Sequence, residues 1–307
     1  MARTRFPADR GLAGRMVLTM FLLGLLYVVF IGVLTALGTS FVVVLVIAGG
    51  LLFAQYAFSD RIALFSMNAH EVSAAEQPVL HGIIDRLCAL ADMAKPRVAI
   101  ADTDLPNAFA TGRDPDHAVV AVTTGLLRRL DEPQLEAVLA HELSHVAHRD
   151  VMVMTIASFL GIAAGLLTRF AFYSGLFGGF GGRHGGDDDN RGAPAVLVVL
   201  VVSVAVYAVS FLLTRALSRY RELSADRAAA VLTGRPSTLA AALVKISGEM
   251  SRIPTRDLRS AEPLNAFFFA PALAPGFSIS SLFSTHPSLE RRLEQLSRIE
   301  ADMGRPA

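Results

Sequence analysis

The chain has 307 residues, of which 53% are hydrophobic, and a formal net charge of +1. A net charge this close to zero indicates no strongly basic surface, so we expect no nucleic-acid partner. A single cysteine, Cys88, excludes an internal disulfide and a cysteine-rich zinc site.

The first apolar stretch, 16–59, contains no Asp, Glu, Lys, Arg or His over its 44 residues. Since about 20 residues cross a bilayer, it predicts two transmembrane helices, at 16–37 and 40–58. The first is too long for the hydrophobic part of a signal peptide, which favours an uncleaved anchor. Four arginines in segment 1–15 favour a cytoplasmic N-terminus by the positive-inside tendency.

The first polar region, 60–150, alternates helical and strand-like patterns. A helix is expected over 75–94, and β-branched stretches at 96–102 and 117–123 predict strands. A further strand is expected at 107–112. A helix start follows at Asp131, as N-cap, with Pro133 in the first turn and Gln134 three residues after the cap.

Neither Gly nor Pro occurs from Gln134 to Leu160, so we predict one uninterrupted helix that runs out of this region and into the membrane. Two further transmembrane helices are predicted at 151–172 and 194–214, separated by an external Gly/Asp-rich loop at 173–193. The fourth can continue unbroken to Thr233, because no Gly or Pro occurs there either.

The second polar region, 215–307, ends in an amphipathic helix over 284–300 and contains a proline-rich segment, 251–285, expected to cover the active-site cleft in part. With four spans, both polar regions lie on the same side of the membrane and can fold together. We therefore predict an α+β fold: a multi-pass protein of the plasma (inner) membrane, with a small sheet and helices in one cytoplasmic domain and both termini cytoplasmic.

The cluster His141, Glu142 and His145 has H-E-x-x-H spacing. On a helix, residues i and i+4 share a face, so both imidazoles can bind one metal ion while the glutamate serves as general base. Zinc is the metal that we expect, one ion per chain, because a His₂Glu set is a known catalytic zinc site.

A third ligand is required, and two positions compete for it. His148 shares the face of His141, but seven residues place it about 10 Å along a straight helix, and we interpret it as a titratable residue at the membrane interface. Glu222 and Asp226 are again i and i+4 on one face, which suits a ligating carboxylate and a carboxylate that orients a ligating histidine. Glu222 also lies at nearly the same height above the predicted spans as His145, so we favour Glu222.

The motifs HELSH, RELSAD, NAFATG and FSTHPSLERRL, in this order, resemble those of the HtpX-type membrane zinc metalloproteases, relatives of the CAAX prenyl proteases. The resemblance implies a zincin fold, zinc ligands His141, His145 and Glu222, and catalytic base Glu142. It implies cleavage of membrane or misfolded proteins at the cytoplasmic face, in protein quality control and the stress response. It also implies roles for residues of three further motifs: an acidic site position at Asp226, a substrate-binding strand with Asn107, Ala108 and Phe109, and a C-terminal motif with His286 and Arg291.

His286 can donate a hydrogen bond to a developing oxyanion, or it can be a packing histidine, and the sequence leaves both open. Two other functions compete with proteolysis of membrane or misfolded proteins. A CAAX-type processing protease needs more spans, and a non-catalytic metal-binding scaffold needs no base at Glu142. An ion transporter is disfavoured, because the spans carry no acidic or histidine residue and only Arg169 near one end. The expected partners are polypeptides and the lipid bilayer, and no oligomeric state is indicated.

Overall fold

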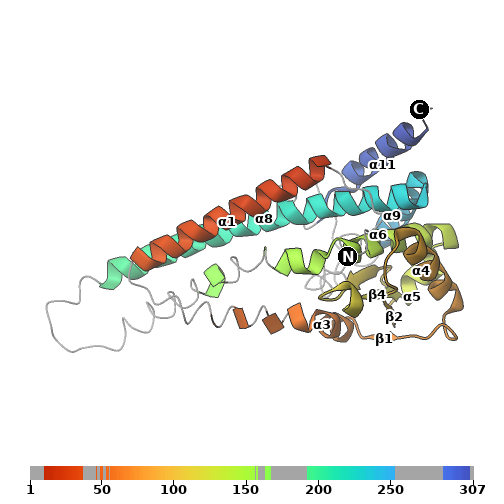
Figure 1. Cartoon of the computed structure of the whole chain (residues 1–307), viewed down its shortest axis with the longest axis horizontal. Coiled ribbons are helices and arrows are strands. Elements are labelled where there is room, and N and C mark those ends of the chain that lie inside the picture. Colours follow the sequence, from red (N-terminus) through yellow and green to blue (C-terminus); the bar gives the residue numbers. More distant parts are fainter. Residues whose placement is uncertain are drawn as a thin grey trace.

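The computed structural model describes residues 10–36, 46, 49–50, 53–54, 56–155, 157, 163–166, 192–252 and 286–304. Two long helices, α1 (Arg10–Ala36) and α8 (Gly192–Thr233), lie side by side and extend away from a folded domain that holds the sheet (Figure 1). The stretches Gly14–Gly32 and Leu197–Thr233 are long and apolar enough to cross a membrane. Several large apolar side chains on both, including Phe21 and Leu197, are exposed, as expected for a surface that contacts lipid.

A four-stranded sheet in the order β1-β2-β4-β3 forms the centre of the domain. Its strands are β1 (Ala69–Glu71), β2 (Arg97–Ala101), β3 (Ala108–Thr111) and β4 (Val119–Thr123). The strands β2 and β4 are parallel, whereas β1 and β3 run antiparallel at the two edges. The strands predicted at 96–102, 107–112 and 117–123 are therefore confirmed.

Side chains of alternating size decide what packs on each face of the sheet. Val98, Ile100, Val120 and Val122 point into the large core, where α4 (Pro78–Ala91), α6 (Glu132–Ala147), α9 (Pro236–Arg252) and α11 (Leu289–Met303) pack. The smaller residues between them, such as Ala99 and Ala121, face α3 (Ser59–Ser66) on the other side. Both faces are buried, which explains the nearly continuous apolar character of β2 and β4.

Shorter elements connect these layers. A 3₁₀ turn, η1 (Pro115–His117), joins β3 to β4, and a short helix, α5 (Thr124–Arg129), follows β4. Asp131 and Gln134 form the predicted capping box at the start of α6. Ser288 caps α11, so the terminal helix begins five residues later than the predicted segment 284–300.

The predicted uninterrupted helix from Gln134 to Leu160 is wrong. Helix α6 ends at Ala147, His148 and Arg149 form a turn, and a new helical segment occupies 150–155. Arg149 has a left-handed backbone with φ 55°, which ends an α-helix without glycine or proline. Sequence composition gave no sign of this break, because neither Gly nor Pro occurs near it.

The return helix is confirmed as continuous, since α8 extends to Thr233. Ala157 and Ala164 of the predicted third span pack in small clusters with side chains of α1 and α8, and Gly165 lies against Tyr207 of α8. Most of the predicted second span (40–58), residues 156, 158–162 and 167–172 of the third, most of the loop 173–193 and residues 253–285 lie outside the described residues.

Candidate metal centre

Helix α6 carries the first half of the site. His141 and Glu142 are buried, with 1% and 4% of their surfaces exposed, and His145 lies one turn further along the same face. The Nε2 atoms of the two histidines are 3.2 Å apart. Because the i, i+4 spacing stacks the two rings on one face, α6 by itself brings both nitrogens to one point.

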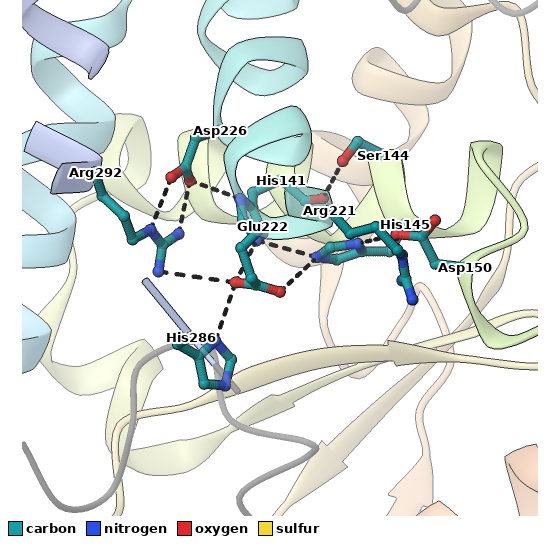
Figure 2. Close-up of polar contacts among 9 residues, drawn as sticks. All are labelled: His141, Ser144, His145, Asp150, Arg221, Glu222, Asp226, His286 and Arg292. Carbon is teal, nitrogen blue, oxygen red and sulfur yellow. Dashed lines mark hydrogen bonds and ion pairs between the residues drawn. The ribbon is translucent and has the colours of Figure 1, made fainter. Parts of the chain in front are cut away.

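Helix α8 carries the second half. Glu222 Oε1 lies 3.4 Å from His145 Nε2, and Glu222 Oε2 lies 3.7 Å from His141 Nε2 (Figure 2). Two ligands held about 2.0–2.1 Å from zinc at a tetrahedral angle are about 3.3 Å apart. The three side chains therefore fit one such ion, and their donor atoms all lie within 4.8 Å of one another.

Each histidine is backed by a carboxylate and an arginine. His141 Nδ1 lies 2.9 Å from Asp226, whose two oxygens accept hydrogen bonds of 2.6 and 2.7 Å from Arg292. His145 Nδ1 lies 2.5 Å from Asp150, and Asp150 also forms an ion pair with Arg221. Figure 2 shows the two arrangements on opposite sides of Glu222. A carboxylate at Nδ1 fixes the ring so that Nε2 is presented to a metal.

The protein's charges set the protonation of these carboxylates. Burial alone would raise the pKa of Asp150, but the charge of Arg221 and the hydrogen bond to His145 lower it to about 2. In Asp226, burial is likewise outweighed, and the charge of Arg292 holds the pKa below its usual value. Both groups are therefore anionic at neutral pH.

Glu142 differs from these carboxylates. Burial raises the pKa of Glu142 above its ordinary value, although the neighbouring His141 and His145 and a backbone hydrogen bond from Ala110 favour the charged form. A buried carboxylate with a raised pKa is suited to accept and return a proton near neutral pH. Ala110 is in the edge strand β3, so this hydrogen bond joins the candidate base to the strand.

A cleft of about 330 Å³ runs past this site. It is lined by residues Ala108 to Gly112 of β3 and the following turn, and by His141, Glu142, His145 and Glu222. Ile62 of α3 and Val151, Met154 and Thr155 of the segment 150–155 also line it. The cleft is therefore shared by the candidate metal-binding side chains and by apolar residues at or next to the ends of the predicted spans.

Some of the remaining predicted site residues line the cleft, and others do not. His286 is buried in the cleft, and its Nδ1 lies 3.1 Å from Glu222 Oε2. Ala108 and Phe109 line the cleft, whereas Asn107 is fully buried, with its backbone held by Thr123. Arg291 is exposed. Contact of these residues with substrate stays a prediction.

Three residues of the site were missed at the level of sequence. Asp150 and Arg221 hold His145, and Arg292 holds Asp226, whereas the motif resemblance directed attention to the neighbouring Arg291. His148, by contrast, is exposed at the end of α6 and is not part of the cluster. A signal existed for Arg292, because it occupies the same face of α11 as the buried Leu296 and Ile299.

This chain resembles known proteins in sequence and in fold. The model of peptidase family M48 matches residues 74–300. Protease HtpX homolog 1 of Streptomyces coelicolor is 60% identical over 302 residues, which are 98% of this chain and 97% of that protein. A protease HtpX homolog of Moorella thermoacetica is 55% identical over 301 residues, 98% of each chain. The crystal structure of S. mikatae Ste24p is similar in fold, with a TM-score of 0.55 and 17% identity over 94% of this chain and 67% of that one.

Proposed function

The chain belongs to peptidase family M48 and is a membrane-bound metalloprotease, and on this premise we propose that it is a zinc-dependent endopeptidase acting at the cytoplasmic face of the plasma membrane. Its substrates are membrane proteins or misfolded polypeptides, as in protein quality control. The observation that carries the proposal is the meeting of His141, His145 and Glu222 at distances that suit one tetrahedral zinc ion.

The side chains divide the chemistry among them. His141, His145 and Glu222 would hold the zinc ion, which would supply Lewis-acid activation of a water molecule and of the peptide carbonyl. Glu142 takes the proton from the attacking water and gives it to the leaving amine, for which its raised pKa suits it. We retain for His286 the predicted hydrogen bond to the developing oxyanion. In this structure its Nδ1 contacts Glu222. Asp226, whose carboxylate lies 2.9 Å from His141 Nδ1, keeps that histidine oriented.

The edge strand β3 gives the substrate a place to bind. Among the described residues it pairs with β4 alone, and residues Ala108 to Gly112 line the cleft. An extended peptide can add to such an edge through main-chain hydrogen bonds, which require no particular sequence. This mode suits a protease that cleaves unfolded or damaged chains.

The position of the cleft supports substrates presented beside the bilayer. Its lining includes the apolar residues Ile62, which adjoins the predicted second span, and Val151 and Met154, at the start of the predicted third span. Four transmembrane helices, with the domain and both termini in the cytoplasm, account for this arrangement and for the arginines that flank the first and fourth spans. We retain the CAAX-type processing protease and the non-catalytic metal-binding scaffold as alternatives.

The test compares detergent-purified wild type with Glu142→Gln, both loaded with zinc, on an unfolded protein substrate. We expect wild type to cleave and the variant to lose cleavage while it still binds zinc, because the ligands are unchanged. Equal cleavage by both proteins would point to a contaminant. Absence of cleavage by either, with zinc bound, would favour the scaffold.

A further inference from the structure

Asp150 lies where α6 has ended and the segment 150–155 begins, and it is 5% exposed. Its Oδ2 is 2.5 Å from Nδ1 of His145, and His145 Nε2 in turn faces His141 and Glu222 at 3.2 and 3.4 Å. The same carboxylate contacts the guanidinium of Arg221 (Figure 2). Asp150 thus contacts one of the candidate ligands, His145, and is not a ligand itself.

This contact exists only because the helix is broken. On a continuous α-helix each residue turns by about 100°, so a side chain five positions after His145 would point about 140° away from it. The left-handed Arg149 ends α6, and its carbonyl accepts the first hydrogen bond of the next helix, from Val153, at 3.3 Å. The change of direction brings Asp150 back beneath His145. A left-handed backbone is unfavourable for arginine, so the surrounding contacts must offset its cost.

The arrangement around His145 matches the one around His141. In both, a buried aspartate contacts Nδ1 of the histidine and a buried arginine contacts the aspartate: Asp226 and Arg292 for His141, Asp150 and Arg221 for His145. Arg221 is the residue before Glu222 on α8. Helix α8 therefore supplies one candidate ligand directly and, through Arg221 and Asp150, fixes another that belongs to α6.

We propose that Asp150 is a positioning residue that holds His145 in the tautomer and orientation needed for metal binding, and that Arg221 fixes Asp150 in that place. The packing of segment 150–155 against α8, at the base of the apolar helices, then sets the geometry of the site. The inference rests on the proposed function only in taking His141, His145 and Glu222 as a metal site, so metal binding, rather than proteolysis, tests it.

The experiment measures zinc affinity of the full-length, detergent-purified chain by competition with a chromogenic chelator, together with the visible spectrum of the Co²⁺-loaded protein. We expect Asp150→Asn to weaken zinc binding about 10–100-fold and to alter the cobalt spectrum, because loss of a carboxylate behind a ligating histidine has effects of that size. Arg221→Gln should give a smaller loss, since Asp150 remains. Asp104→Asn is the matched control, because Asp104 is 83% exposed and pairs only with surface arginine Arg128 among described residues.

The thermal unfolding of each metal-free protein separates positioning from a structural role. The proposal requires Asp150→Asn to lose more zinc affinity than its loss of metal-free stability accounts for. If that variant binds zinc as tightly as wild type, the proposal is overturned. It is also overturned if the lower stability of the metal-free variant accounts for its whole loss of zinc affinity.

If Asp150→Asn does not fold, Asp150→Glu decides, because it keeps a charge for Arg221 but displaces the carboxylate by one methylene. Weakened zinc binding in this folded variant supports the positioning role. Wild-type binding, or failure of both variants to fold, overturns it. A wild-type chain that binds no zinc would instead refute the proposed function and this inference with it.

Discussion

Glu222 and His286 are 64 residues apart in the chain, yet Nδ1 of His286 lies 3.1 Å from Oε2 of Glu222. One is on the long helix α8, and the other directly precedes α11. The docking of α11 against α8 thus brings a buried histidine to the carboxylate that we propose as third ligand.

That contact allows the two roles of His286 to be separated. If it orients Glu222, His286→Ala should weaken zinc binding about tenfold as well as lower kcat. If it only donates a hydrogen bond to the oxyanion, kcat should fall by about 10²–10³ at unchanged zinc affinity. From the observed contact we expect the first result, measured by chelator competition and steady-state kinetics on one preparation.

The neighbouring arginines Arg291 and Arg292 form a natural matched pair. Arg292 is 2% exposed and makes two hydrogen bonds to Asp226, so Arg292→Met should destabilise the protein by about 3–5 kcal/mol by leaving a buried carboxylate unpaired. Arg291→Met, at an exposed position, should change the free energy of unfolding by less than about 0.5 kcal/mol. Denaturant unfolding of both variants measures this. A raised KM in Arg291→Met alone would support its predicted contact with substrate.

Removal of metal should abolish activity and lower stability together. A ligand that binds only the folded state, at a free concentration of about 100 times its Kd, adds about 2.7 kcal/mol to the free energy of unfolding. We therefore expect a zinc-chelating agent to stop cleavage and to lower Tm, with recovery of both on adding zinc. In Glu222→Gln, which weakens the ligand set, the same treatment should shift Tm much less. An equal shift in the variant would place the metal elsewhere.

The left-handed turn at Arg149 gives a prediction about the break itself. Arg149→Gly should keep the turn and leave zinc affinity unchanged, because glycine adopts φ 55° readily. Arg149→Val should weaken zinc binding and destabilise the fold by about 1–2 kcal/mol, since a β-branched residue disfavours this conformation. The two variants remove the same charge, so a common effect on zinc affinity would implicate the guanidinium and not the backbone.

Cys88 is a convenient probe of the intact domain. Burial, aided by the charge of Asp85, raises the pKa of the Cys88 thiol to about 11, so the neutral form is favoured in the folded state. At pH 8 its alkylation should be at least about 100-fold slower than in urea, where the pKa is about 8.5.

The raised pKa of Cys88 also determines how the stability of the protein changes with pH. The contribution of the buried thiol is fully present below about pH 8.5 and is lost as pH rises towards 11, because only the unfolded chain ionises readily. Native alkylation at the urea rate would contradict the burial of α4 in the core, and Cys88→Ser serves as the unreactive control.

The sequence by itself determined the features that depend on local spacing. H-E-x-x-H places two imidazoles on one face of any helix, and the capping box at Asp131 and the alternation in β2 and β4 are equally local. Together with the order of four motifs, they were sufficient to identify the family correctly. Lengths of apolar sequence were sufficient to find the long helices α1 and α8.

The tertiary structure alone decided which side chains contact the proposed metal ligands. Asp150 reaches His145 because of a helix break that no glycine or proline marks in the sequence. Arg292 rather than Arg291 faces Asp226, because α11 packs with that side inward. The pairs that join α8 to α11, Asp226 with Arg292 and Glu222 with His286, span more than 60 residues. Such contacts depend on how helices pack in three dimensions, and helical periodicity specifies only which face a residue occupies, not what that face will meet.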